Sequence, residues 1–587
     1  MRITGPNNRG EIVTNWCKLF IYILSAIVIS SIIIDYGFEL HISELNIIHS
    51  IYRFAWWFYL VLYLLMIIFK RKYINRRTLF FTIFVALLLF LSIIGSNFNF
   101  SHIINRFFLF VFSIIELSRG IINLIGKKTN PALVLSLGFL FIILVGAILL
   151  MVPRSTLPHL RISVVDALFV STSAVCVTGL SPVEISSTFT LAGQVIILVL
   201  IQIGALGVMT ITSIFTLFFM GETSLSSQLV LRDMVGSERL SSLISTLLYI
   251  LGFTFVIELA GVGFVWLSVH DTLGYTLEEE LFFSIFHSIS AFCNAGFSTL
   301  DGNLGNVAVM RGNNLFYVII SILVILGGIG FPILVNFKKM LFYYIKWFAY
   351  RVGIIKNRPL RYLHLTNLNT KIVIYSTICL IVIGTLLIAV IEWNSAFASM
   401  DTIEKIIQSL FNAVVPRTAG FNSVDLTSFS FLTIIIYTFL MWVGGASQST
   451  AGGIKVNTFM VAIANFISIL GGKENVQLYG REINTYSVRR VGAIIFGSLA
   501  TILLFWSLLI LIEYDIKPHK LLFETVSAIS TVGSSLGVTP HLKPESKILL
   551  SLLMFIGRVG LITVLTGLME PGKKQLYRYP SENVIIN

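Results

Sequence analysis

Residues 444–459, GGASQSTAGGIKVNTF, combine several glycines, Ser and Thr hydroxyls and a lysine within an otherwise apolar region. The apolar run TIIIYTFLMWV precedes this stretch and MVAIANFISIL follows it. A helix facing lipid cannot be broken in this way, because each unpaired backbone group in hydrocarbon costs several kcal/mol. The stretch is therefore predicted to be a polar loop inside the membrane, buried by protein or lining a water-filled cavity.

Four other short runs share a different pattern, in which an amphiphilic helix-like segment ends in a tight segment containing glycine. They are DALFVSTSAVCVTGLS (166–181), ELFFSIFHSISAFCNAGFS (280–298), EKIIQSLFNAVVPRTAGFNS (404–423) and KLLFETVSAISTVGSSLG (520–537). Each run is too short to span the membrane and is expected to enter it and return, which requires a protein-lined cavity. The key glycines, Gly179, Gly296, Gly420 and Gly533, recur at nearly equal intervals, as a tandem duplication would produce.

This pattern predicts a cation pathway. Helix C-termini carry about −0.5 of an elementary charge, so four of them aimed at one axis favour a cation there. A glycine after each helix lets backbone carbonyls point inward, and rings of carbonyls replace the hydration shell of potassium in channel filters. A single Ala-Gly or Thr-Gly would be an ordinary turn, whereas four in equivalent places favour pore loops.

Two ionisable residues lie deep in apolar runs. Arg558 occurs in SLLMFIGRVGLITV, and an arginine within a span is by default a functional-site hypothesis. The alternative for Arg558 is a salt bridge that only holds helices together. For Glu258, in FTFVIELAGVGF, a structural role is favoured, with a partner that the sequence does not identify.

Composition defines the class of protein that contains these residues. The chain has 587 residues, is 56% hydrophobic and 12% charged, and has a mean hydropathy of +0.90. Soluble domains average about 25% charged residues, and apolar runs of spanning length recur here, so the fold class is an all-α polytopic membrane protein. The net charge of +13 is expected from Lys and Arg held on the cytoplasmic side. Four cysteines show no metal-binding or disulfide spacing.

The expected organisation is an N-terminal segment followed by four membrane–pore-loop–membrane repeats. Residues 1–130 contain four candidate spans, at 18–35, 53–70, 78–95 and 104–125, before the repeats begin. The boundaries that we expect for the repeats and the tail are 131–235, 236–365, 366–488 (which includes the broken loop), 489–570 and, for a cytoplasmic tail, 571–587.

Charge in the loops predicts the orientation. Loops on the glycine side of the repeats are acidic: Asp166, Glu184, Asp271, Glu278, Glu279, Glu280, Asp301, Asp401, Glu404, Asp425 and Glu545. Opposite loops are basic: Lys338, Lys339, Lys346, Arg351, Lys356, Arg358, Arg361, Lys371, Arg489, Arg490, Lys573 and Lys574. Basic loops stay in the cytoplasm, so the tight segments should open outside, where acidic loops concentrate cations. Both chain ends are then cytoplasmic.

The motifs SAVCVTGLS, FCNAGFS, RTAGFNSVD and TVGSSLG, together with GGASQSTAGGIK, resemble the Trk/Ktr/HKT superfamily of potassium transporters, and most closely the bacterial Trk and Ktr membrane subunits. The resemblance covers about residues 131–570 and gives no role to the first 130. It implies pseudo-fourfold symmetry, one pore per protomer of a homodimer, and potassium as substrate with no organic cofactor. It also implies the bacterial inner membrane and a cytosolic ring of nucleotide-binding (ATP/ADP or NAD) regulatory subunits.

The resemblance also assigns roles to residues. The implied selectivity filter consists of Val177, Thr178, Gly179, Asn294, Ala295, Gly296, Thr418, Ala419, Gly420, Thr531, Val532 and Gly533, which would hold K⁺. The implied gating residues, in the break of the third repeat and the last span, are Gly444, Gly445, Ser447, Ser449, Thr450, Gly452, Gly453, Lys455 and Arg558. In the plant branch a serine at the first glycine accompanies sodium transport, so Gly179 implies potassium. Ser534 and Ser535 depart from the family pattern after the fourth glycine.

Two alternatives have different sequence requirements. An ion-coupled secondary transporter, for sodium/potassium symport or an organic solute, would use discontinuous helices at the membrane midplane. The break at 444–455 fits that class, but four re-entrant loops do not. An intramembrane enzyme would need clustered catalytic side chains, and the chain has no such cluster, P-loop or zinc motif. We therefore expect a transport protein and not an enzyme.

Overall fold

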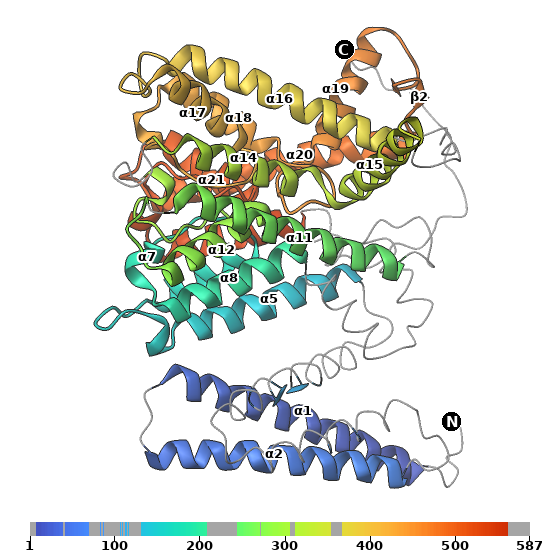
Figure 1. Cartoon of the computed structure of the whole chain (residues 1–587), viewed down its shortest axis with the longest axis vertical. Helices are drawn as coiled ribbons and strands as arrows, with labels where there is room; N and C mark the ends of the chain where they lie inside the picture. The colour runs from blue at the N-terminus through green and yellow to red at the C-terminus, as the bar shows by residue number, and fades with distance from the viewer. Residues whose placement is uncertain are drawn as a thin grey trace.

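The computed structural model describes residues 8–38, 42–69, 131–207, 243–270, 272–305, 312–353 and 367–560, with a few single residues between 83 and 116. The regular secondary structure in these ranges is almost entirely helical, as expected for an all-α membrane protein (Figure 1). The exception is a small antiparallel ladder of β1 (Gln477–Leu478) and β2 (Arg481–Glu482). Its turn at Tyr479 and Gly480 uses positive φ angles of 51° and 73°, which suit a two-residue hairpin.

Two N-terminal helices, α1 (Asn8–Gly37) and α2 (Ile42–Phe69), pack side by side around a hydrophobic core of their own (Figure 1). They correspond to the first two expected spans, 18–35 and 53–70, and both helices are longer than those spans. Asp35 lies within α1 and pairs with Arg106 at 3.3 Å between Nη1 and Oδ2. Most of the expected spans at 78–95 and 104–125 lie outside the described residues.

Four groups of helices follow, and each has the order long helix, short helix, loop, helix. The groups are α5 (Pro131–Leu150), α6 (Val164–Val175) and α8 (Leu191–Leu206); α11 (Leu243–Val269), α12 (Leu277–Cys293) and α14 (Asn314–Ile329); α16 (Leu368–Glu392), α17 (Thr402–Val414) and α18 (Phe431–Trp442); and α20 (Thr485–Ile512), α21 (Pro518–Ile529) and α22 (Pro544–Val559). Short connecting helices are η3 (Pro153–Ser155), α7 (Ile185–Thr188), η5 (Asn303–Gly305), η6 (Leu426–Ser428) and η7 (Thr539–His541).

Local sequence accounts for where many of these helices begin. Thr276 and Glu279 form a reciprocal capping box at the start of α12, and Ser430 caps α18 by accepting the Thr433 N–H. Pro518 and Pro544 open α21 and α22, where a missing N–H has no cost. Helix starts are therefore set by short polar signals beside apolar runs.

The groups pack into one body through contacts that link each to the next. The last helix of one group packs on the short helix of its neighbour: α8 on α12, α14 on α17, α18 on α21 and α22 on α6. The largest hydrophobic core draws residues from all four groups. In contrast, apolar side chains such as Leu259, Val390 and Leu511 lie on the outer faces, exposed by 70%, 80% and 76%. Because lipid tails solvate such faces, the whole arrangement is that of a multi-pass membrane protein.

Two of the later helices are interrupted. The expected break in the third group is present, with α18 and α19 (Val456–Leu470) joined by residues 443–455, which we call the intramembrane loop. A second break was not expected: α14 and α15 (Phe331–Arg351) meet at a bend of 100°. Gly330 (φ +98°) and the following Pro332 form this bend, because glycine permits the backbone angle and proline favours a new helix start.

Candidate functional site

Four tight segments, residues 177–179, 294–296, 418–420 and 531–533, follow the C-terminal ends of α6, α12, α17 and α21. Their backbones share one conformation, with positive φ both at the first residue and at the glycine. The φ values at the first residues are Val177 55°, Asn294 60°, Thr418 77° and Thr531 48°, and at the glycines Gly179 98°, Gly296 71°, Gly420 73° and Gly533 96°. Left-handed backbone is uncommon outside glycine, so its occurrence at four equivalent non-glycine positions marks a specialised structure.

Each glycine of the tight segments lies against the backbone of the next tight segment, and these four contacts form a closed ring. A Cβ atom added to each glycine would meet the carbonyl oxygen of the middle residue in the next segment. The separations would be Gly179 to Ala295 2.4 Å, Gly296 to Ala419 2.6 Å, Gly420 to Val532 2.4 Å and Gly533 to Thr178 2.1 Å. Real Cβ atoms do not approach so closely. The ring therefore needs glycine at all four positions, and it runs in chain order and closes on itself.

Backbone carbonyls of serines behind the segments hold three of them in the same way. Ser173, Ser290 and Ser527 each lie six residues before the glycine, and their carbonyls accept the middle-residue N–H at 2.8, 2.7 and 2.9 Å. The Ser173 and Ser527 hydroxyls also accept the glycine N–H at 3.0 and 3.1 Å. In the third segment this position is Val414, and the Ala419 N–H bonds to the Val415 carbonyl at 2.9 Å. The third segment is thus supported differently.

The two serines that depart from the family pattern are structural. The Ser534 hydroxyl bonds to the Tyr437 hydroxyl at 3.0 Å, and the Ser535 hydroxyl donates to the Glu524 carboxylate. His287 with Ser298, at 2.9 Å, and Asn412 with Ser423, at 3.0 Å, make comparable bonds behind the second and third segments. By contrast, the buried Thr178 and Thr531 hydroxyls have no protein partner in the described chain.

The intramembrane loop is tied to helices of other groups. The Ala446 N–H donates to the Gly328 carbonyl at 2.9 Å, and the Phe331 N–H donates to the Gln448 carbonyl at 3.1 Å. The Thr450 hydroxyl donates to the Phe292 carbonyl, just before the second tight segment, at 3.3 Å. A Cβ at Gly452 would lie 1.8 Å from the Thr531 hydroxyl oxygen of the fourth segment. The loop therefore lies directly against the tight segments.

The glycines and hydroxyls predicted in this loop have identifiable structural tasks. The Gly444 N–H donates to the Ile454 carbonyl at 2.9 Å, and Gly453 adopts a positive φ of 67° that closes the loop. A Cβ at Gly445 would meet the Ala451 Cβ at 2.4 Å, and the Ser449 hydroxyl donates to the Ala446 carbonyl at 2.7 Å. The Ser447 carbonyl faces Gly330 at the bend of α14 and α15. The loop is folded so tightly that larger side chains would not fit at these glycine positions.

Two basic side chains hold the intramembrane loop. Arg558, near the end of α22, donates from Nη1 to the Thr450 carbonyl and from Nη2 to the Gly204 carbonyl of α8, both at 2.5 Å. Lys455 donates to the Ala451 carbonyl at 2.6 Å. Arg558 therefore bridges α22, the loop and α8, and its partners among the described residues are carbonyl groups and not the acidic group of a salt bridge.

Glu258 has the partner that the sequence did not identify. Gln202 of α8 donates from Nε2 to both Glu258 carboxylate oxygens at 3.1 Å. The Cys293 thiol, one residue before the second tight segment, lies 3.6 Å from Oε1. This buried cluster joins the first and second groups, in line with a structural role. Of the other cysteines, Cys17 and Cys176 are buried and Cys379 is exposed.

Acidic residues in or beside the loops that precede or follow the short helices have defined surroundings. Burial raises the pKa of Glu184, and the nearby Asp301 adds to that rise, although the Gly302 N–H donates to the carboxylate. Hydrogen bonds from Thr276 lower the pKa of the exposed Glu279. The opposite ends of the long helices carry the exposed basic residues Lys346 and Arg351 on α15 (Figure 1).

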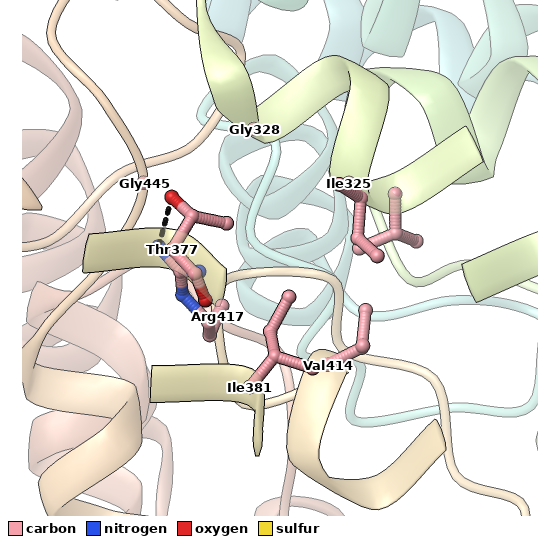
Figure 2. A pocket seen from close by; sticks show the side chains of 8 residues that line it. Ile325, Gly328, Thr377, Ile381, Val414, Arg417 and Gly445 are labelled. Atoms are coloured by element: carbon pink, nitrogen blue, oxygen red, sulfur yellow. Dashed lines mark hydrogen bonds between the residues drawn. The ribbon is translucent and has the colours of Figure 1, made fainter. Parts of the chain in front are cut away.

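Sequence analysis missed Arg417, which lies immediately before the third tight segment and is 7% exposed. Its guanidinium donates to the Gly444 carbonyl at 3.3 Å and to the Thr377 carbonyl at 3.4 Å. It also lines a small pocket between helices (Figure 2), whose other lining residues are Val324, Ile325, Gly328, Thr377, Ile381, Val414 and Gly445. The signal that could have found it is a charged residue between an apolar helix and a glycine turn.

Comparisons with known proteins agree on one family. A family model described as TrkH, cation transport protein, matches residues 141–574. The chain is 33% identical over 468 residues to the potassium/sodium uptake protein NtpJ of Enterococcus hirae, covering 79% of this chain and 98% of that protein. It is 34% identical over 460 residues to the Ktr system potassium uptake protein B of Bacillus subtilis, covering 78% and 97%. The crystal structure of the potassium transporter TrkH from Vibrio parahaemolyticus has the same fold, with a TM-score of 0.58 and 17% identity over 83% of this chain and 96% of that one.

Proposed function

From the premise that this chain belongs to the TrkH family of cation transport proteins, we propose that it conducts potassium across the bacterial cytoplasmic membrane. The four groups of helices are then tandem membrane–pore-loop–membrane repeats around a pseudo-fourfold axis, and the tight segments are its selectivity filter. One observation carries the proposal: the closed ring of glycine and carbonyl contacts that links the four segments in chain order.

The chemistry of the ring suits a dehydrated monovalent cation. Four short helices end at the ring, so their partial negative charges add there. The backbone conformation needed for inward carbonyls is the one that all four segments share. The free Thr178 and Thr531 hydroxyls add neutral oxygen ligands. Within the described residues, no group of three or more His, Cys, Asp or Glu side chains could hold a metal ion.

The intramembrane loop is the proposed gate. It lies against the second and fourth tight segments, and Arg558 holds it to helices of two other groups. A fixed guanidinium repels a passing cation by about 4 kcal/mol at 4 Å even at an effective dielectric near 20. We therefore propose that Arg558 acts as a barrier and a loop anchor. We infer that the chain forms a homodimer and that a cytosolic nucleotide-binding partner binds its basic end, which carries Lys346 and Arg351. Binding of this partner would release the intramembrane loop from Arg558.

Complementation of a potassium-uptake-deficient bacterium at low potassium tests the function, with initial uptake in proteoliposomes as the quantitative measurement. Potassium or rubidium uptake without an organic solute is the expected result. Ion-coupled symport is the second candidate, because the relative from Enterococcus hirae is named a potassium/sodium uptake protein. Uptake that requires a sodium gradient would favour this candidate. Absence of potassium uptake by correctly inserted protein, with and without a regulatory subunit, would contradict the proposal.

A further inference from the structure

Arg417 touches three parts of the third group at once. Its backbone immediately precedes the third tight segment, and its side chain donates to α16 through the Thr377 carbonyl, at 3.4 Å, and hydroxyl, at 3.5 Å. The guanidinium also donates to the Gly444 carbonyl at the start of the intramembrane loop, at 3.3 Å. One rigid donor group thus links the tight segment, the first span and the loop.

The electrostatics of Arg417 make this link depend on the loop. A buried cation is costly unless it is paired, yet among the described residues Arg417 has no ion-pair partner and its Nε has no acceptor. Its favourable field comes from the C-terminal ends of α17 and α18, which carry partial negative charge. Gly444 lies two residues beyond the end of α18, at the start of the loop, and its carbonyl accepts a hydrogen bond from the guanidinium. Moving the loop would therefore remove an important partner of the guanidinium.

The third tight segment also lacks the support that the others have. Val414 occupies the place of the serine that holds the first, second and fourth segments, and the backbone bond pattern differs there. The pocket beside Arg417 is bounded by α14, α16, α17 and Gly445 of the loop, and Figure 2 shows Arg417 and Thr377 together at its edge.

We propose that Arg417 couples the intramembrane loop to the third tight segment, so that the position of the loop sets ion selectivity as well as flux. While the loop is in place, the Gly444 carbonyl fixes the guanidinium and, through it, residues 418–420. When the loop moves away, that bond breaks and the third segment loosens. The inference rests on the proposed function and extends it by naming a positioning residue for selectivity.

A double-mutant cycle on the ratio of potassium to sodium initial uptake tests this coupling in proteoliposomes of the full chain. Arg417→Gln should lower the ratio at least about fivefold, the lower end of typical coupling between sites. Gly452→Ala, which displaces the loop from Thr531, should lower it in the same direction. The double variant should match the larger single effect, because the bond is already broken in either background. Arg154→Gln, an exposed arginine in η3, is the matched control.

Two results would overturn the coupling. In the first, Gly452→Ala leaves the ratio of potassium to sodium uptake unchanged; in the second, the fold-changes of the two single variants multiply in the double variant. If Arg417→Gln is not inserted, Arg417→Lys replaces it in the cycle. It keeps the charge but loses the planar donor fork, so a smaller change in the same direction is expected, and no change would contradict the proposal. Failure of the function itself is distinct, because the wild-type chain would then take up no potassium.

Discussion

At the scale of single residues, the site depends on glycines, which have no side chain, and on two buried arginines. Each glycine of the tight segments leaves room for a carbonyl oxygen of the next segment. Arg558 and Arg417 bind carbonyl groups, and no acidic partner is found for either within the described part of the chain. Carbonyl oxygens thus surround the proposed ion path and also accept hydrogen bonds from the two arginines.

Gly179→Ala should reduce selectivity for potassium over sodium by about tenfold. The new methyl group would lie 2.4 Å from the Ala295 carbonyl oxygen, and alanine at a φ of +98° adds strain of about 1–3 kcal/mol. Initial uptake of each ion in proteoliposomes measures the effect. Gly274→Ala is the control, because Gly274 also has a positive φ, 65°, but no neighbour within 4 Å. Equal ratios for wild type and Gly179→Ala would exclude Gly179 from the filter.

Arg558→Gln should raise basal potassium uptake about tenfold and weaken its dependence on a regulatory subunit. The change removes two charged hydrogen bonds that hold the loop, each of which contributes about 1.5–3 kcal/mol. Arg558→Lys should be intermediate, because it keeps a charge but not the donor fork. Uptake is compared at matched protein content, alongside thermal stability. Lower uptake accompanied by an equal loss of stability would assign Arg558 a purely structural role.

At the scale of elements, the intramembrane loop contacts several helices at once. Its backbone bonds to α14 and α15, and its Thr450 side chain reaches the end of α12. The unexpected bend at Gly330 is part of this arrangement, since the Phe331 N–H at the start of α15 donates to the loop. Two broken helices therefore meet below the tight segments, where one was expected.

Gly452→Ala should open the path by displacing the loop, without substitution of either arginine. The added methyl group cannot coexist with the Thr531 hydroxyl 1.8 Å away, so the loop must move from the fourth tight segment. We expect basal potassium flux to rise several-fold in proteoliposomes without a regulatory subunit. Gly472→Ala, at a glycine of positive φ (63°) with no neighbour within 4 Å, is the control beyond α19. Reduced flux through well-inserted protein would indicate that the loop forms part of the conduction path and does not block it.

At the scale of the whole molecule, charge and hydrophobicity are arranged along the helices. Figure 1 shows α7 and α17 at one end of the long helices, and α15 with the β hairpin at the other. Acidic Glu184 and Glu279 lie near the first end, whereas Lys346 and Arg351 lie at the second. The N-terminal pair α1 and α2 has its own core and meets the larger body where Gly37 packs on Val152.

This charge separation predicts the orientation in the membrane, because basic segments are retained in the cytoplasm. In a Cys379→Ser background, which removes the exposed cysteine, Glu279→Cys should react with an impermeant maleimide on intact cells. Lys346→Cys should react only after permeabilisation. Both positions are exposed, so burial does not account for a difference. The reverse pattern would invert the proposed direction of the pore.

Much of this protein could be predicted from its sequence, because bilayer physics acts on local patterns. Apolar length and polar breaks predicted membrane helices and a loop inside the membrane, since hydrocarbon leaves few options for unpaired backbone. The motif at Gly444–Lys455 and the isolated Arg558 were enough to select the residues of the proposed gate. Short-range signals such as the Thr276 capping box also predict helix starts without tertiary information.

Only the tertiary structure decided which groups face one another. The partners of Glu258 and Arg558, at Gln202 and Gly204, come from helices far away in the chain, and no local pattern encodes such a meeting. The bend at Gly330 and the position of Arg417 likewise depend on the loop packing against them. The closed ring of four glycines and four carbonyls is the clearest case. Each glycine is visible in the sequence, but the reason that it must be glycine is an atom in the next tight segment.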